Sequence, residues 1–416
     1  MNYKVVAPAS LPSNAVVSLP ASKSISNRAL ILDALTGFKS KITNLSKAND
    51  TAVLRRMLKP ENGLVDADDA GTALRFAAVY FSLVDGEHVI TGTERLMNRP
   101  MQPLLDALKV LSQRDPFGSG NASFKKVDGK KLLVIRGGKL KGGEVTVDGS
   151  ESSQFVSALL LCGAAMQNGL VVHLKGNIVS EPYIDMTLGL MSLAGIEFIK
   201  SKKKIIVPNQ VIRPFKLKIE NDWSSASYFY ALLSCMTSGK LMLNGLVADS
   251  LQGDAVLMEL MEVFGVKSRQ TDEGIEIEKR KVVLPKSVTV NAKDFPDLVP
   301  AFTTAALCNG VEIKFKGVGH LKLKESNRIN GLVATAKHAG AKARLNGKDG
   351  FSISRVQTFS GIPFIKTFDD HRMAMAFALL STRFESVTIE NALVVKKSFP
   401  DFWREMKKLG FGVSKA

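Results

Sequence analysis

The chain has 416 residues, of which 45% are hydrophobic and 23% are charged, and its formal net charge is +17 at pH 7. This composition excludes an intrinsically disordered protein, and the length favours two domains of ordinary size. Because no basic and apolar leader opens the chain and no segment is apolar enough to span a bilayer, we expect a cytoplasmic protein that does not bind membranes.

One amphipathic helical pattern recurs along the chain, each time with a glycine just past its end. The closing glycines step by 70, 75 and 70 positions and are Gly195, Gly265, Gly340 and Gly410. Each suits the left-handed residue that ends a helix. A short strand is expected after them, for example at 196–198 and 266–268, and the pattern before Gly265 predicts a helix over 254–264.

A second kind of helix alternates with the first and is apolar nearly all round. Its six predicted copies start near Ser24, Gly71, Ser152, Ser224, Leu298 and His371. A helix without a polar face must be buried, so these copies should form a central core with the amphipathic helices and strands outside. Six repeated units therefore fill the chain, and the strand segments argue against a purely helical solenoid.

The last unit ends directly after its closing glycine and lacks the final strands of the other copies. We expect the N-terminus to supply them. The sequence therefore predicts two domains of three units each, one formed by residues 21–222 and the other by residues 1–20 with 223–416. One unit of the first domain is trimmed near 58–69 and should lack a strand pair. Catalytic residues should gather where the chain crosses between the domains, near Pro20 and Asp222.

The cysteines and histidines do not suggest a metal site. Cys162, Cys235 and Cys308 each lie in an apolar run, far apart in the sequence, and are predicted to be buried reduced thiols. None of the five histidines has the spacing of a metal-ligand pair.

Basic and small residues occur where helices should begin, and a helix N-terminus binds phosphate or carboxylate through its free N–H groups and partial positive charge. Lys23, Ser24 and Arg28 mark one such start. At another, Gly71 allows close approach of a ligand to the backbone, and Arg75 follows one helical turn later. With only 7% aromatic residues, the basic charge favours small anions over nucleic acid.

Eight motifs, taken in order, resemble those of the EPSP synthases, which are enolpyruvyl transferases. The motifs cover 23–28, 71–75, 96–100, 152–155, 180–183, 324–328, 370–375 and 397–400. The resemblance spans almost the whole chain. It implies an α/β fold of two domains, each with three βαβαββ units around buried parallel helices in pseudo-threefold arrangement. It also implies an active site in the interdomain cleft, no cofactor and no metal, and we expect a monomer.

The resemblance implies that the enolpyruvyl group of phosphoenolpyruvate is transferred to the 5-hydroxyl of shikimate 3-phosphate, on the route to aromatic amino acids. Together these substrates carry roughly −5 to −6 charges, which must meet cations when they are enclosed. The residues implied for shikimate 3-phosphate are Lys23, Ser24, Arg28, Ser152, Ser153, Gln154, Ser180, Tyr183, Asp297 and Lys324. Those implied for phosphoenolpyruvate are Lys23, Gly71, Arg75, Arg99, Gln154, Arg328, Arg372 and Lys397.

The implied reaction needs one base and one acid. Asp297 is the candidate base for the hydroxyl, and Glu325 is the candidate acid toward the methylene carbon, with Lys23 as the alternative acid. Structural roles compete with binding at two positions. Ser180 could be a helix cap, and Tyr183 could pack or cap.

Three positions depart from the family pattern. Asp69 stands where Asn is usual, Phe76 where Pro is common, and His320 where an Asn often contacts shikimate. Two rival functions stay open at this point. One is the sister enolpyruvyl transferase that acts on UDP-N-acetylglucosamine, and the other is a basic protein of similar repeat architecture that binds or modifies RNA ends.

Overall fold

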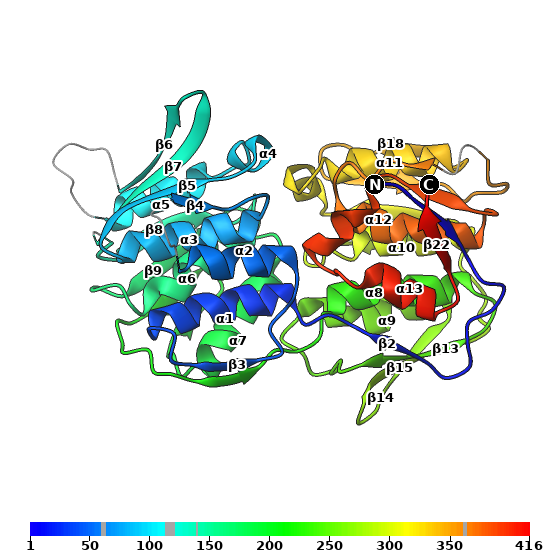
Figure 1. Cartoon of the computed structure of the whole chain (residues 1–416), viewed down its shortest axis with the longest axis horizontal. Helices are drawn as coiled ribbons and strands as arrows, with labels where there is room; N and C mark the ends of the chain where they lie inside the picture. Colours follow the sequence, from blue (N-terminus) through cyan, green and yellow to red (C-terminus); the bar gives the residue numbers. More distant parts are fainter. Residues whose placement is uncertain (60–63, 113–120, 139, 361–363) are drawn as a thin grey trace. The chain divides into compact units, whose positions relative to one another are not determined.

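The computed structural model describes residues 1–59, 64–112, 121–138, 140–360 and 364–416. The chain folds into two compact units, each with its own core (Figure 1). The N unit is Ser22–Ile219, and the C unit is Met1–Ala21 together with Glu220–Ala416. The two connections run side by side within the C unit, where the Asp222 N–H donates to the Pro20 carbonyl at 2.9 Å.

The C unit contains three four-stranded sheets with one common strand order. In each sheet a parallel pair forms one edge and antiparallel strands complete the rest. The first sheet has the order β14 (Val266–Gln270), β15 (Gly274–Lys279), β13 (Lys240–Asn244) and β2 (Ala15–Ser18). The second is β18 (Ala343–Leu345), β19 (Gly350–Ile353), β17 (Glu312–Lys316) and β16 (Ser287–Asn291). The third is β22 (Gly412–Lys415), β1 (Tyr3–Val6), β21 (Val387–Ile389) and β20 (Phe364–Ile365).

The two strands at the N-terminus complete two sheets of the C unit. Strand β1 lies between β21 and β22, with Val5 opposite Val387 on one side and Val413 on the other. Strand β2 forms the parallel edge of another sheet by pairing with β13. Residues near the N-terminus are therefore integral to the C unit, and both chain ends lie in it (Figure 1).

The N unit repeats the same sheet twice and a shortened version once. Its four-stranded sheets are β6 (Ala122–Val127), β7 (Lys130–Gly137), β5 (Gly86–Thr91) and β4 (Leu64–Asp66), and β10 (Ile199–Lys200), β11 (Lys204–Val207), β9 (Leu170–Lys175) and β8 (Gly143–Asp148). The third sheet has only the parallel pair β3 (Lys41–Thr43) and β12 (Lys216–Lys218). Among the described residues, this third sheet has no antiparallel pair of strands. Residues 60–63 of the trimmed segment lie outside the described residues.

Each unit surrounds three central helices that are buried on nearly every side. These are α1 (Lys23–Leu35), α3 (Gly71–Leu83) and α6 (Ser153–Gly163) in the N unit, and α8 (Trp223–Cys235), α10 (Val299–Cys308) and α12 (His371–Ala378) in the C unit. Every residue of α8, α10 and α12 is buried. Their starts match the six predicted positions, because a helix without a polar face can be stable only inside the core.

Other helices cover these central ones. The α-helices are α2 (Asn49–Met57), α4 (Glu94–Met97), α5 (Gln102–Leu111), α7 (Glu181–Leu193), α9 (Leu257–Leu260), α11 (Arg328–His338) and α13 (Phe402–Lys408). The 3₁₀ helices are η1 (Gly253–Val256), η2 (Met261–Phe264), η3 (Gly319–Leu323), η4 (Leu379–Thr382) and η5 (Ala392–Lys397). The closing glycines Gly195, Gly265, Gly340 and Gly410 have φ of +75°, +75°, +97° and +91°, as predicted.

Two local predictions are wrong. The helix predicted over 254–264 is divided into η1, α9 and η2, whose tight 3₁₀ turns flank a single α-helical turn. The strand predicted at 196–198 is absent, and β10 begins at Ile199 instead. The Glu197 N–H donates to the side chain of Gln210 at 2.9 Å, so it is not available to a strand ladder.

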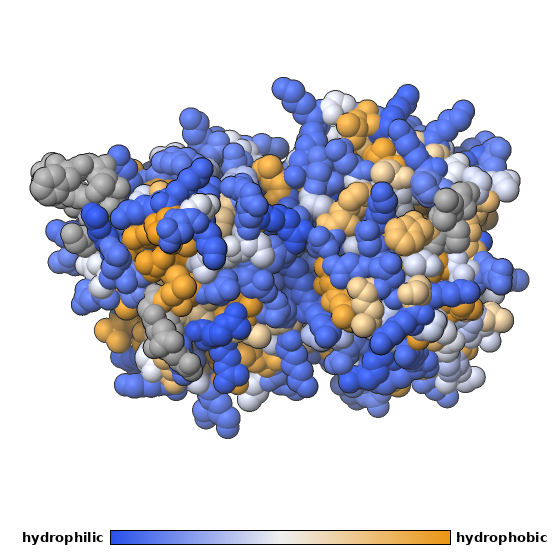
Figure 2. Space-filling model, turned by 45° about the horizontal axis from the view of Figure 1, so that its top comes forward, coloured by the Kyte–Doolittle hydropathy of each residue, from blue (hydrophilic) through white to orange (hydrophobic). Residues whose placement is uncertain are grey.

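The cysteines lie in the protein interior. All three cysteines are buried and free, as predicted. Hydrophilic residues cover most of the face shown in Figure 2, with apolar patches among them. In the part of the chain that the structure describes, no helix is both long and apolar enough to cross a membrane.

Candidate active site

The predicted site residues fall into two groups, one in each unit. The N unit holds Lys23, Ser24, Arg28, Gly71, Arg75, Arg99, Ser152, Ser153, Gln154, Ser180 and Tyr183. The C unit holds Asp297, Lys324, Glu325, Arg328, Arg372 and Lys397. Within each unit most of them gather at the first turns of the central helices and of the helices that pack against these.

Arg28 is a buried cation in the N unit that is held by neutral groups. Its guanidinium donates to the Thr187 and Ser157 hydroxyls at 2.7 and 3.2 Å and to the Ser24 and Tyr183 carbonyls at 2.9 and 3.1 Å. Burial lowers its pKa to about 10. An arginine has five N–H donors, so one remains, and no carboxylate pairs with Arg28 among the described residues. A buried cation of this kind is suited to an anionic ligand.

Gly71 brings two arginines close together at the start of α3. A Cβ placed on Gly71 would lie 2.5 Å from Arg99 Nη1 and 2.9 Å from Arg75 Nη1. Arg75 donates to the Gln154 side chain at 2.8 Å, and the Gln154 amide donates to the Thr72 hydroxyl at 3.1 Å. The structure therefore joins the predicted Gly71, Arg75, Arg99 and Gln154 in one cluster that links α3 to α6.

The serines of the N unit occupy helix starts. Ser152 caps α6 by accepting from the Gln154 N–H at 3.2 Å, and Ser153 is buried beside it. Ser180 stands at the N-cap position of α7 with φ of +56°, but its side chain makes no capping hydrogen bond. The capping role that was the alternative for Ser180 is therefore not carried by its hydroxyl. A left-handed non-glycine residue is strained, and such residues cluster at functional sites.

Lys23 and Tyr183 each have a defined neighbour. The Lys23 ammonium forms an ion pair with Asp50 of α2 at 2.9 Å, and both side chains are largely buried. The Tyr183 ring faces the Arg28 guanidinium, with 6.0 Å between the guanidinium carbon and the ring centroid. Tyr183 thus helps to position Arg28 whether or not it touches a ligand.

In the C unit, the fully buried Arg328 binds three carboxylates. Its Nε donates to Asp370 at 2.9 Å. Nη1 lies 3.2 Å from Asp297, and Nη2 lies 2.7 Å from Glu325. Burial opposes the charge of Arg328, but Asp370, Glu325 and Asp297 raise its pKa above the ordinary value. One guanidinium therefore holds both predicted acid–base residues in place.

Asp297 bridges Arg328 to a second arginine. Arg372 donates to the other oxygen of Asp297 at 2.6 Å and to the Tyr228 hydroxyl at 3.4 Å. Burial alone would raise the pKa of Asp297. The cations Arg372, Lys324 and Arg328 outweigh burial and hold the pKa well below its usual range. Asp297 is therefore ionised, and it becomes a stronger base when other anions neutralise these cations.

Lys324 and Lys397 belong to the C unit group less directly. Lys324 lies near enough to Asp297 to lower its pKa. Lys397 is buried at the end of η5, which packs against α12, the helix that carries Arg372. Lys324 therefore adds positive charge around Asp297.

The departures from the family pattern have local explanations. Asp69 forms an ion pair with Arg95, and the Phe76 ring lies 5.5 Å from the Arg28 guanidinium carbon. His320 is 6% exposed, and neither ring nitrogen has a hydrogen-bond partner among the described residues. Burial, with Lys324 and Arg328, lowers its pKa to about 3 although Asp297 opposes this. The neutral imidazole offers one donor and one acceptor, as a side-chain amide also does.

Three residues of the site were missed as functional candidates. Asp370 is fully buried, caps α12 by accepting from the Arg372 N–H at 2.9 Å, and pairs with Arg328. Asp50 pairs with Lys23, and Tyr228 contacts Arg372. Asp370 directly precedes the helix start at His371, which is the usual place of a capping carboxylate, so its sequence position carried a signal. The other two pairings depend on contacts between separate helices.

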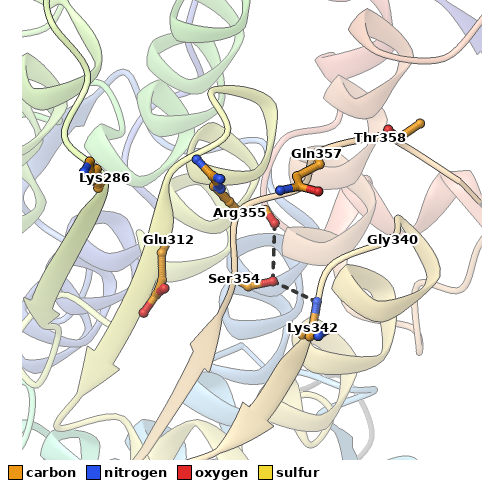
Figure 3. A pocket seen from close by; sticks show the side chains of 8 residues that line it. All are labelled: Lys286, Glu312, Gly340, Lys342, Ser354, Arg355, Gln357 and Thr358. Atoms are coloured by element: carbon orange, nitrogen blue, oxygen red, sulfur yellow. Dashed lines mark hydrogen bonds between the residues drawn. The ribbon is translucent and has the colours of Figure 1, made fainter.

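A separate hollow of about 720 Å³ in the C unit contains none of the predicted residues (Figure 3). Its lining residues are Lys286, Glu312, Gly340, Lys342, Ser354, Arg355, Gln357 and Thr358. Gly340 follows the C-terminus of α11, whose partial negative charge favours nearby cations. The exposed cations Lys342 and Arg355 are thus explained by their position. Within the described ranges, no group of three or more His, Cys, Asp or Glu residues could hold a metal ion.

Known proteins resemble the chain along its whole length. The family model of EPSP synthase (3-phosphoshikimate 1-carboxyvinyltransferase) matches residues 9–60 and 53–406. A 3-phosphoshikimate 1-carboxyvinyltransferase of Bacteroides fragilis strain YCH46 is 38% identical over 418 residues, which cover 99% of each chain. One of Xenorhabdus nematophila is 31% identical and covers 95% of this chain and 96% of its own.

Solved structures confirm the fold class. EPSP synthase from Acinetobacter baumannii superposes with a TM-score of 0.76 at 19% identity, covering 100% of both chains. An enolpyruvyl transferase from Streptomyces tendae gives 0.71 at 12% identity, covering 99% of this chain and 98% of its own. The family model and the relatives also confirm the predicted family. They favour it over the transferase that acts on UDP-N-acetylglucosamine and over the RNA-end protein. From its sequence over nearly the whole length and from its repeated α/β units, the chain belongs to the EPSP synthase (3-phosphoshikimate 1-carboxyvinyltransferase) family of enolpyruvyl transferases.

Proposed function

We propose that this chain transfers the enolpyruvyl group of phosphoenolpyruvate to the 5-hydroxyl of shikimate 3-phosphate and releases phosphate. The observation that carries the proposal is the placement of acid–base carboxylates directly on buried guanidinium groups in a chain of this family. Arg328 and Arg372 hold Asp297 at 3.2 and 2.6 Å, so a base stands next to cations that suit an anionic substrate.

The N unit supplies the complementary group. We propose that Arg28, Ser152, Ser153, Ser180 and Tyr183 bind the phosphate of shikimate 3-phosphate, with Ser24 on the ring. Arg28 supports this assignment because it is buried, retains one N–H and has only neutral partners within the described part of the chain. Arg75, Arg99 and Gln154 would bind phosphoenolpyruvate from the same unit. We further propose that the two groups of residues bind one substrate pair.

Asp297 is the proposed base. As anionic substrates approach Arg328 and Arg372, the positive charge around Asp297 falls and its proton affinity rises. The carboxylate then takes the proton of the 5-hydroxyl while the oxygen attacks the enol carbon. Loss of phosphate completes the transfer, with proton movement in the reverse direction.

Two groups offer the proton for the methylene carbon. Lys23 carries its proton as an ammonium that is ion-paired with Asp50. Glu325 lies 2.7 Å from Arg328, which favours the carboxylate, so it must first gain a proton. Glu325→Gln and Lys23→Met, compared for solvent-proton incorporation into the methylene group of the product, separate the two. The variant that lacks the donor loses incorporation.

Phosphate release tests the function directly. Phosphoenolpyruvate and shikimate 3-phosphate are supplied singly and together to the purified chain. Release is expected only with both substrates, because the hydroxyl of one must attack the other before phosphate can leave. Release with phosphoenolpyruvate alone, or none with both, contradicts the proposal. UDP-N-acetylglucosamine in place of shikimate 3-phosphate is the matched control and should give no release.

Gly71→Ala is expected to weaken phosphoenolpyruvate binding selectively. The added methyl would come within 3 Å of Arg75 and Arg99, and both guanidinium ends must shift. The fold should persist because flexible side-chain ends can move. We expect KM for phosphoenolpyruvate to rise about tenfold, since displaced cations lose aligned hydrogen bonds. KM for shikimate 3-phosphate serves as the internal control and should stay unchanged. Equal increases in KM for both substrates would contradict this role of Gly71.

A further inference from the structure

Asp254 is a buried carboxyl group that the mechanism above does not use. It lies in η1 and is 4% exposed. One of its oxygens accepts a hydrogen bond from the Ser224 hydroxyl in the first turn of α8. The other oxygen, Oδ1, has no hydrogen-bond partner among the described residues. Natural proteins rarely leave a buried polar atom unsatisfied, so this group needs an explanation.

Helix α8 connects Asp254 to Arg372 and to the proposed base Asp297. Ser224 and Tyr228 are four residues apart and therefore lie on the same helix face. Ser224 donates to Asp254, while the Tyr228 hydroxyl accepts from Arg372 at 3.4 Å. Arg372 in turn holds Asp297 at 2.6 Å. The face of one helix thus contacts both the unused acid and the arginine that positions the proposed base.

The charged groups around Asp254 come from three elements. Asp222 caps α8, Asp297 precedes α10, and Arg372 begins α12. Burial, followed by Asp297, raises the pKa of Asp254 to about 7, against the lowering effects of the Ser224 hydrogen bond and Arg372. A neutral acid can remain buried at low cost, whereas a carboxylate at this place must find a cation.

We propose that Asp254 is a positioning residue whose neutral acid form leaves Arg372 bound to Asp297, and whose carboxylate form competes with Asp297 for that guanidinium. The inference rests on the proposed function, because it needs Arg372 to bind phosphoenolpyruvate, as the family resemblance implies. When Asp254 ionises, its charge repels Asp297 and attracts Arg372, so Arg372 leaves its place. Phosphoenolpyruvate binding then weakens as pH rises.

The pH dependence of KM for phosphoenolpyruvate tests this role, with Asp254→Asn as the variant that mimics the neutral acid. At pH 6.0, wild type and Asp254→Asn should have similar kcat and KM. Between pH 6.0 and 8.5, the wild-type KM should rise about fivefold more than that of Asp254→Asn. Substrate ionisation affects both proteins equally and cancels in the ratio. Parallel profiles, or a variant impaired at pH 6.0, would overturn the proposal.

Ser224→Ala gives an independent check in the opposite direction. The Ser224 hydroxyl stabilises the Asp254 carboxylate. Removal of this hydroxyl therefore raises the pKa of Asp254 and moves the rise in KM to higher pH. If the rise in KM of Ser224→Ala occurs at the same pH as in wild type, or at lower pH, the proposal is contradicted.

A stability measurement separates this inference from the proposed function, because it requires no substrate. The folded-state pKa of Asp254 lies above the unfolded value of 3.8, so its contribution to stability is complete below 3.8 and is lost as pH rises through about 7. Asp254→Asn should therefore lose less thermal stability than wild type between pH 5 and 8. If this holds but phosphate release fails, only the reaction assignment is wrong. Equal pH dependence of melting in both proteins would contradict the ionisation of Asp254.

Discussion

Asp297→Ala is expected to lower kcat by about 10²–10⁴-fold, the usual contribution of a positioned general base. KM for both substrates should change by less than about threefold. In the folded chain the carboxylate occupies Arg372 at 2.6 Å and Arg328 at 3.2 Å, so its removal leaves these cations available to anionic substrates. Steady-state kinetics with each substrate varied in turn measures both constants.

Two further variants sharpen this result. Asp297→Asn keeps a hydrogen-bonding side chain near Arg372 but cannot take a proton, so its kcat should fall nearly as far. Asp294→Ala removes a carboxylate three residues earlier, where it pairs with Lys293 at 3.8 Å, and should leave kcat within about twofold. If Asp297→Ala lowers kcat and raises KM by equal factors, the base lies elsewhere.

Arg328→Met is expected to destabilise the C unit by about 3–5 kcal/mol, the typical cost of removing one partner from a buried ion pair. Arg328 is fully buried and pairs with Asp370, Glu325 and Asp297, and Asp370 is fully buried as well. Both tryptophans, Trp223 and Trp403, lie in the C unit. Denaturant unfolding followed by tryptophan fluorescence therefore reports on this unit.

Three comparisons test the electrostatic origin of that loss. Arg344→Met removes an exposed arginine of β18 and should cost less than about 0.5 kcal/mol. Asp370→Asn added to Arg328→Met should restore part of the stability, because one uncompensated carboxylate is gone. The deficit of Arg328→Met should also shrink as pH falls and the remaining carboxylates gain protons. An Arg328→Met protein within about 1 kcal/mol of wild type would contradict this stabilising role of Arg328.

The sequence predicted the central helices well because their burial leaves a strong local signal. Helices such as α8 and α10 have no polar face, and the left-handed Gly265 and Gly340 close repeated patterns. The motifs likewise placed arginines at helix starts, where the backbone itself favours anions.

Other features depended on contacts that the sequence does not encode locally. The pairing of Lys23 with Asp50, and of Arg372 with Tyr228, joins residues from different helices. The division of the predicted helix at 254–264 coincides with burial of Asp254 against α8, an override of helical periodicity by tertiary contacts. The strained backbone of Ser180 also had no sequence signal, because serine usually avoids that conformation.

We propose that cations of both units bind one pair of anionic substrates. A crystal structure with shikimate 3-phosphate and a phosphonate analogue of phosphoenolpyruvate that cannot lose phosphate tests it most directly. We expect Lys23 and Arg99 of the N unit, and Arg372 of the C unit, to lie within about 3.2 Å of oxygens of the bound pair. Ligands that contact residues of only one unit would contradict it.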